Sequence, residues 1–161
     1  MVSPIRRPEE ILAYRPLRDM LAGKSRQLWS VAPSDPVIRA VELMAEKHIG
    51  CVLVLENDRP IGLLSERDCV RRVMLPGRSP QTTPVSEVMA RNLVTCDLNH
   101  TFADCLRLMH SHGIRHLPIV VDGLAVGVIS MRDLAAEAAA HHAKLLAEIE
   151  YERLQAFTST V

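Results

Sequence analysis

The sequence contains an internal repeat. When the chain is shifted by 65 residues, residues 28–68 align with residues 93–133 without a gap. Eight of the 41 aligned positions are identical, and four of these eight fall within one seven-residue block. Such a repeat indicates two copies of one supersecondary unit. Each copy has only about 50 residues, too few to bury a core alone, so the two should pack together.

Both copies show the same signals for a helix. In the first copy, Ser34-Asp35-Pro36 predicts a capping side chain followed by Pro in the first turn. Apolar residues then recur at helical spacing, at Val37, Ala40, Val41 and Met44. In the second copy, Asn99 and Thr101 are candidate caps, and Gly113 suits the position just past the helix end. The apolar face there comprises Phe102, Cys105, Leu106 and Met109.

Short β-branched runs predict two further strands in each copy, joined by a turn. The runs are 52–55 and 61–64 in the first copy and 117–121 and 126–129 in the second. Asn57-Asp58 and Asp122-Gly123 separate them, and the second pair strongly favours a hairpin. A second helix should begin at Ser65 or Ser130. With a short leading strand, each copy is predicted to be strand–helix–strand–strand–helix, giving an α/β (α+β) fold with a pseudo-two-fold axis.

The predicted boundaries follow from the repeat and from local composition. They are an N-terminal extension at 1–16, repeat 1 at 17–75, a Pro/Ser/Thr-rich linker at 76–84, repeat 2 at 85–140 and a helical tail at 141–161. Short amphipathic segments, 17–21 and 85–89, stand at the start of both copies alike. The stretch from Arg132 to about Phe157 lacks Gly and Pro, which predicts one long helix.

The repeated block is Gly62-Leu-Leu-Ser65-Glu-Arg67-Asp68 and Gly127-Val-Ile-Ser130-Met-Arg132-Asp133. One interpretation is structural, because Ser-x-x-Asp after a strand resembles a capping box. The other is a nucleotide site. The Gly would let a ligand approach the backbone, the carboxylate would accept ribose hydroxyls, and Ser and Arg would reach phosphates at a helix N-terminus. A cap needs neither the Gly nor the Arg, so the doubled block favours the nucleotide site.

The doubled block and the segment Ile114-Arg-His-Leu-Pro118 resemble the CBS (cystathionine β-synthase) domain, and the tandem pair resembles a Bateman module. The resemblance covers about residues 17–140 and is closest to small stand-alone bacterial CBS-pair proteins. It implies a regulatory module that binds AMP, ADP, ATP or NAD, with S-adenosylmethionine less favoured, in clefts between the repeats. It also implies a homodimer and a downstream protein whose identity the sequence does not give.

The resemblance also implies which residues form the clefts. Asp68 and Asp133 would hold the two riboses. The remaining candidates are the neighbouring polar side chains, the segments beside the adenine and the hydroxyls of the leading strands: Ser65, Arg67, Ser130, Arg132, Ile49, Gly50, Cys51, Ile114, Arg115, His116, Pro118, Ser30 and Thr95. Where repeat 2 has Arg115-His116, repeat 1 has Gly50-Cys51, so the two clefts should bind phosphates unequally.

Composition narrows the class of function. Nineteen basic residues balance nineteen acidic ones, which disfavours nucleic-acid binding through phosphate neutralisation. No apolar run approaches the ~20 residues of a membrane span. The charged N-terminus shows no secretory signal, so a cytoplasmic protein with four reduced cysteines is expected.

Other chemistry is less well supported by the sequence. Five histidines suggest a metal site, but His110 and His112 do not share a helix face and no H-E-x-x-H is present. His141 and His142 are expected on the solvated side of the tail helix. No nucleophile has a catalytic motif around it, so neither an enzyme nor a metal site is expected. Two alternatives remain beside the sensor: an interaction protein with vestigial clefts and, as a minor one, a redox thiol at Cys51.

Overall fold

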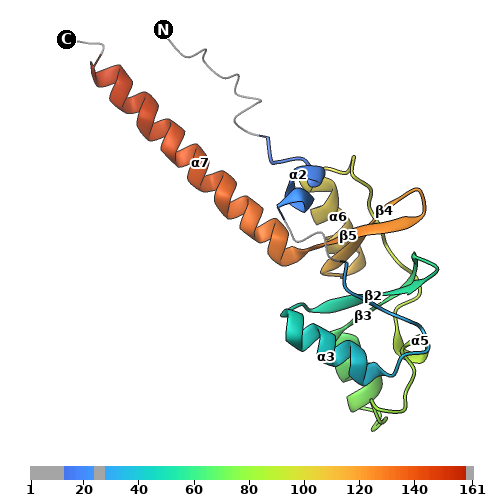
Figure 1. The fold of residues 1–161 in the computed structure, drawn as a ribbon. Helices are drawn as coiled ribbons and strands as arrows, with labels where there is room; N and C mark the ends of the chain where they lie inside the picture. Colours follow the sequence, from blue (N-terminus) through green and yellow to red (C-terminus); the bar gives the residue numbers. More distant parts are fainter. Residues whose placement is uncertain (1–12, 24–27, 159–161) are drawn as a thin grey trace.

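The computed structural model describes residues 13–23 and 28–158, which form two stacked halves and a projecting helix (Figure 1). The first half contains β1 (Ser30–Val31), α3 (Val37–Lys47), β2 (Cys51–Glu56), β3 (Arg59–Ser65), α4 (Glu66–Cys69) and a π-helical segment, η1 (Val70–Met74). Its sheet has the order β1-β2-β3, with β1 parallel and β3 antiparallel to β2. The predicted order of elements in repeat 1 is therefore present.

The second half contains α6 (Phe102–His112), β4 (His116–Val121), β5 (Leu124–Ser130) and α7 (Met131–Thr158). Strands β4 and β5 pair antiparallel. The leading strand predicted near Thr95 is reduced to one parallel bridge between Cys96 and Ile119. The single long helix predicted for the tail is confirmed by α7.

The turns follow the sequence signals more closely than the helix caps do. Asn57, Asp58, Asp122 and Gly123 all have positive φ, as two-residue hairpin turns require. Gly113 ends α6 in the left-handed conformation.

The caps confirm one of the two candidates in the second copy and correct the prediction in the first. Thr101, not Asn99, caps α6 in a capping box with Asp104. In the first copy Pro36 itself occupies the N-cap position and no side chain caps α3. The Asp35 carboxylate instead accepts a hydrogen bond from the Ala32 N–H, 2.8 Å away, so the predicted cap there is wrong.

The short helices α2 (Leu17–Ala22) and α5 (Val85–Val88) cross between the halves. Helix α5 begins repeat 2, yet Val85, Val88 and Met89 complete the core formed by α3, β2 and β3. Helix α2 begins repeat 1, yet Leu17 and Met20 lie in the core with Leu117, Ile129 and Leu134. Each repeat therefore lends a segment to the core of the other (Figure 1).

The repeated glycines make this crossing sterically feasible. A Cβ built on Gly62 would lie 2.3 Å from Met89 Sδ, and one on Gly127 would lie 2.4 Å from Leu21 Cδ2. Glycine therefore leaves room for the crossing segment at both positions, most tightly at Gly62, where the Ala90 carbonyl oxygen also lies 3.2 Å away. The glycines therefore have a packing role beside the approach of a ligand that the sequence predicts, and that approach stays a prediction.

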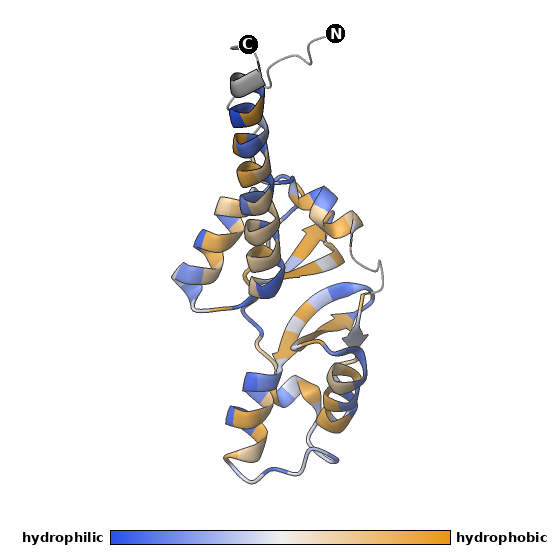
Figure 2. Ribbon diagram, turned by 90° about the vertical axis from the view of Figure 1, so that its left-hand side faces the viewer, coloured by the Kyte–Doolittle hydropathy of each residue, from blue (hydrophilic) through white to orange (hydrophobic). Residues whose placement is uncertain are grey.

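Helix α7 is anchored at its base and then projects from the body (Figure 2). Tyr14 stacks on Phe102 with ring centroids 3.9 Å apart and lies 4.4 Å from the ring of His141. His141 is therefore partly covered, contrary to the solvated position predicted for it, whereas His142 is exposed. Leu106, predicted on the apolar face of α6, is 41% exposed. Within the described ranges, no helix is both long enough and apolar enough to cross a bilayer.

Candidate functional site

One cleft of about 1400 Å³ lies between the two repeats and is lined by both. Thirteen of the fifteen predicted binding residues line it: Ile49, Gly50, Cys51, Ser65, Arg67, Asp68, Ile114, Arg115, His116, Pro118, Ser130, Arg132 and Asp133. Ser30 and Thr95 do not line it; Ser30 pairs with Leu53 in the sheet and Thr95 is exposed elsewhere. The structure thus brings the two copies of the repeated block to one hollow.

The Ser and Asp of each block have nearly the same geometry. Ser65 Oγ lies 2.5 Å from Asp68 Oδ2, and the Ser65 N–H donates to the same oxygen at 3.1 Å. In repeat 2 the corresponding distances from Ser130 to Asp133 Oδ2 are 2.6 and 2.7 Å. Each Asp N–H donates back to the Ser hydroxyl. The capping-box interpretation is therefore correct, and it fixes both carboxylates at the cleft wall.

Capping does not exhaust the acceptor capacity of these carboxylates. Asp68 uses Oδ2 for the cap, while its Oδ1 lies 3.6 Å from Arg72 Nε. A carboxylate offers about four lone-pair positions, so a carboxylate in a capping box can still accept hydrogen bonds from a ligand.

The strand-to-helix junctions also match between the repeats. The Glu66 N–H donates to the Gly50 carbonyl at 3.1 Å, and the Met131 N–H donates to the Arg115 carbonyl at 2.9 Å. These bonds hold the start of each central strand beside the block that carries the aspartate. The side chain of His116 reaches across to repeat 1. Its Nε2 lies 3.4 Å from the position that a Cβ on Gly50 would occupy.

Sequence reasoning missed several cleft residues. Trp29 and Lys47 line the cleft together, with Lys47 Nζ 4.6 Å from the centroid of the Trp29 ring. Arg18 and Leu21 reach the cleft from α2, which only the crossed packing brings there. Trp29 was visible as the lone tryptophan beside a leading strand, but no local pattern marks the α2 residues.

Arg72 and Arg78, which follow the first repeated block, have partners of their own. Arg72 Nη1 donates to the carbonyls of Val88 and Met89 at 2.9 and 3.0 Å, so it caps α5. Arg78 pairs with Glu87 and does not line the cleft. Over the described part of the chain, no group of three or more His, Cys, Asp and Glu residues is placed to hold a metal ion.

All four cysteines are buried, and none of them forms a disulfide. Burial, followed by the negative charge of Asp68, raises the pKa of Cys69 to about 11. A hydrogen bond with Cys105 and burial raise the pKa of Cys96. Cys51 lines the cleft at 7% exposure. Thiolates at Cys69 and Cys96 are therefore disfavoured near neutral pH.

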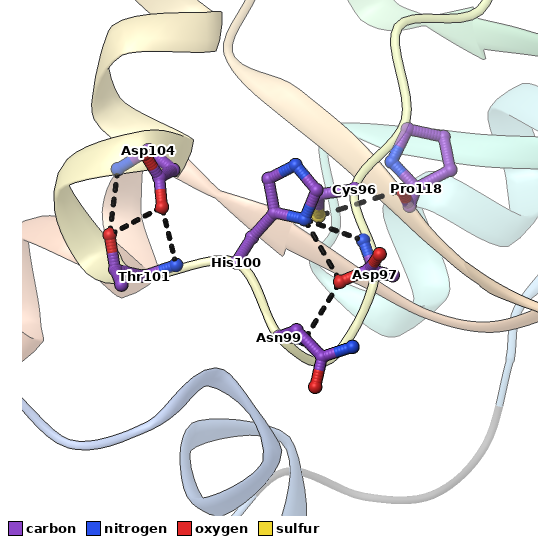
Figure 3. Close-up of polar contacts among 7 residues, drawn as sticks. All are labelled: Cys96, Asp97, Asn99, His100, Thr101, Asp104 and Pro118. Atoms are coloured by element: carbon purple, nitrogen blue, oxygen red, sulfur yellow. Dashed lines mark hydrogen bonds and ion pairs between the residues drawn. The ribbon is translucent and has the colours of Figure 1, made fainter.

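A smaller hollow of about 420 Å³ lies at the N-terminal end of α6. Here Thr101 and Asp104 form a third capping box, with Thr101 Oγ1 2.6 Å from Asp104 Oδ2 (Figure 3). Beside it, His100 Nδ1 lies 3.0 Å from an Asp97 carboxylate oxygen and lowers the pKa of that carboxyl. The capping box of Thr101 and Asp104 therefore has the same geometry as the two boxes at the cleft wall, but it lies outside the cleft.

Comparison with known proteins identifies the family. The CBS domain family model matches residues 18–75 and 85–140. The CBS domain-containing protein YhcV of Bacillus subtilis is 38% identical over 109 residues, which cover 68% of this chain and 77% of that protein. The crystal structure of the CBS domain NE2398 is 34% identical with a TM-score of 0.74, covering 78% of this chain and 98% of the other. A putative signal-transduction protein from Burkholderia ambifaria is 35% identical with a TM-score of 0.74, covering 77% and 93%. The family-model match takes in more than half of the chain, which therefore belongs to the CBS-domain family as a tandem pair.

Proposed function

We propose that the cleft binds adenine nucleotides and that this binding is a regulatory signal. CBS-pair proteins are generally regulatory, ligand-binding modules rather than catalysts. The observation that carries the proposal is the pair of equivalent carboxylates, Asp68 and Asp133, held at the wall of one shared cleft. A carboxylate in this position suits the two hydroxyls of a ribose, each of which donates a charge-assisted hydrogen bond.

The charge of the cleft supports an anionic ligand. Seven Lys and Arg residues line it, against three Asp and Glu residues, a difference of +4 in a chain whose total formal charge is zero. The cations are Arg18, Lys47, Arg67, Arg71, Arg72, Arg115 and Arg132. Concentrated positive charge in a concave site raises the local concentration of anions. It favours AMP, ADP, ATP and NAD over the cationic sulfonium of S-adenosylmethionine.

The second candidate is an interaction protein whose clefts are vestigial, and thermal unfolding separates it from a sensor. In a panel of AMP, ADP, ATP, NAD, NADH and S-adenosylmethionine, a ligand at 100 times its Kd should add about 2.7 kcal/mol of stability. For a chain of this size that corresponds to an upward shift of several degrees in Tm. No shift with any member of the panel would leave the interaction protein as the better assignment.

Removing either ribose carboxylate should weaken one nucleotide site. For Asp68→Ala and Asp133→Ala we expect losses of about 1.5–3 kcal/mol, roughly 10- to 150-fold in affinity, measured by calorimetry. Both variants also lose a helix cap, so Asp104→Ala is the matched control: it removes the same cap geometry outside the cleft. Wild-type titration curves in the double aspartate variant would contradict the nucleotide assignment.

The two sites should also differ from each other. The His116 side chain lies against Gly50, near the block that carries Asp68, which supports placing Arg115 and His116 at the phosphates of the Asp68 site. The Asp133 site has Gly50 and Cys51 in their place. We therefore expect Arg115→Ala to weaken the Asp68 site roughly 10- to 100-fold for mono- and diphosphates and to spare the other. Calorimetry of Arg115→Ala in the two aspartate-variant backgrounds measures each site alone; equal losses would reject the asymmetry.

The output of the sensor is a partner protein or its own assembly. Val70, Met74 and Leu75 are 46, 69 and 77% exposed in consecutive turns. Contiguous exposed apolar groups of this kind mark interaction surfaces. We propose that the chain forms a two-fold symmetric homodimer, the commonest closed assembly.

A further inference from the structure

The residue one helical turn after each aspartate of the cleft differs in charge between the repeats. In repeat 1 it is Arg72, four residues after Asp68; in repeat 2 it is Glu137, four residues after Asp133. Residues four apart on a helix lie on the same face, so each of these side chains starts beside its aspartate. Both also bind the chain at a crossing helix, α5 or α2. The same position of each repeat therefore connects the aspartate to a crossing helix.

Arg72 joins three parts of the structure. Its Nη1 donates to the carbonyls of Val88 and Met89 at the C-terminal end of α5, at 2.9 and 3.0 Å. Its Nε lies 3.6 Å from Asp68 Oδ1, and its side chain is 48% exposed and lines the cleft. A guanidinium holds its donors in a rigid planar fork. The bonds to α5 therefore fix the direction in which Nε faces Asp68.

The oxygen that Arg72 faces is the one outside the capping box. Oδ2 of Asp68 accepts from the N–H and the hydroxyl of Ser65, whereas Oδ1 faces the guanidinium. Both oxygens of the carboxylate are thus held before a ligand arrives. An acceptor that is already oriented loses less conformational entropy when the hydroxyls of a ribose bind to it.

The C-terminal end of α5 also forms part of the cleft wall. Met89 packs against Gly62. The next residue, Ala90, lines the cleft and exchanges two backbone hydrogen bonds with Leu63, at 2.8 and 3.0 Å. The carbonyls that hold Arg72 therefore belong to a segment that is fixed on β3 and borders the proposed ligand.

Repeat 2 makes a different connection at the equivalent position. The Glu137 side chain is 4% exposed and accepts from Arg15, and neither residue lines the cleft. A carboxylate at this position repels the Asp133 carboxylate instead of attracting it. The link from the ribose carboxylate through a guanidinium to a crossing helix is therefore specific to repeat 1.

We propose that Arg72 is a positioning residue that couples nucleotide binding at Asp68 to the docking of α5. The guanidinium orients Oδ1 toward the ribose, and a bound ribose holds the guanidinium on the carbonyls of α5. Such coupling is reciprocal, so a nucleotide secures α5 by the same factor by which docked α5 tightens the nucleotide. This role rests on the proposed nucleotide binding, and it makes the helix that begins repeat 2 the element that responds to the Asp68 site.

Calorimetry in an Asp133→Ala parent tests the positioning at the Asp68 site alone. Arg72→Gln keeps an amide that can donate to the α5 carbonyls but loses the charge that faces Asp68, and it should weaken AMP binding roughly 3- to 10-fold. Arg72→Lys keeps the charge and should restore most of that loss. Arg78→Gln is the matched control, because it removes an ion pair with Glu87 of the same helix outside the cleft; it should bind AMP as the parent does.

The choice of ligand shows whether Arg72 acts through the ribose carboxylate. AMP and adenosine should lose the same factor in Arg72→Gln, because the phosphate is not involved. The ligand 2′,3′-dideoxy-AMP lacks the hydroxyls that Asp68 would accept and should lose nothing. A loss for AMP without one for adenosine would reveal a direct phosphate contact and overturn the positioning role. Unchanged AMP binding in Arg72→Gln would overturn this role alone, whereas a parent that binds no nucleotide would contradict the proposed function as well.

Hydrogen exchange measures the coupling to α5. In the Asp133→Ala parent, saturating AMP should slow the exchange of the Met89 and Ala90 N–H groups roughly 3- to 10-fold relative to the Cys105 N–H of α6, which reports global stabilisation. In Arg72→Gln this additional protection should disappear. Equal protection of α5 and α6 in the parent, or undiminished protection of α5 in Arg72→Gln, would overturn the coupling.

Discussion

Arg15→Ala should destabilise the folded protein by about 1–2 kcal/mol near neutral pH, a fall of roughly 2–8 °C in Tm. Arg15 donates from Nε to Glu137 Oε2 at 2.7 Å and from its backbone N–H to Oε1 at 3.2 Å. The Glu137 side chain is only 4% exposed, whereas that of Arg15 is 59% exposed. Removing the guanidinium therefore leaves a partly buried carboxylate without its cation, which costs more than losing a fully exposed pair.

The pH dependence of the stability lost in Arg15→Ala tests whether the ionised Glu137 carboxylate is the cause. Hydrogen bonds from Arg15 hold the pKa of Glu137 below its ordinary value of 4.5. The pair therefore stabilises the fold above that value, and its contribution is lost as the pH falls through the lowered folded pKa. The gap in Tm between wild type and Arg15→Ala should narrow as the pH drops below 4.5. Arg39→Ala, which removes an exposed pair with a 3.7 Å separation, should change Tm little at any pH. A gap that stays constant with pH would contradict the explanation.

A side chain added at Gly62 should also destabilise the fold. We expect Gly62→Ala to lower the free energy of unfolding by about 1–3 kcal/mol, because the new methyl group overlaps Met89 and lies 3.2 Å from the Ala90 carbonyl oxygen. Gly127→Ala should cost less, because only the end of the Leu21 side chain has to move. Chemical denaturation measures the loss. Gly23→Ala is the control, since its new Cβ would meet only carbonyl oxygens at ordinary distances of 3.7 and 3.8 Å.

Shortening the opposing side chain tests whether this overlap is the cause. In the double variant Gly62→Ala/Met89→Ala, the combined loss should be smaller than the sum of the single losses. Strict additivity would mean that Gly62 is needed for some other reason.

The sequence predicts the elements of each repeat well because their signals are local. Asp122-Gly123 determines a hairpin by its own backbone preferences, and Gly113 ends a helix in the same way. The Ser and Asp of the repeated block also determine their geometry locally. Thirteen of the fifteen candidate residues line one cleft, and nucleotide binding by them stays a prediction that calorimetry tests.

The features that the sequence left open or predicted wrongly are properties that no local pattern encodes. An amphipathic segment has an apolar face, but its sequence does not say which core that face joins; Leu17 and Val85 both pack with the other repeat. The role of Gly62 depends on Met89, which lies 27 residues later in the chain and in another element. Leu106 is exposed although its helical spacing is that of a core residue. Periodicity cannot separate an apolar surface position from a core position on the same helix.

The exchange of α2 and α5 between the halves determines the order in which the cores can close during synthesis. Ribosomes extend a chain from its N-terminus, and domains generally fold in that order. The core of repeat 1 cannot close until Met89 has emerged, and α2 has no core to join until Leu134 follows, 117 residues after Leu17. Contacts so distant in sequence form late, because the loop between them must be ordered first. Among the described segments, α2 is thus the first helix to be made and among the last to be placed.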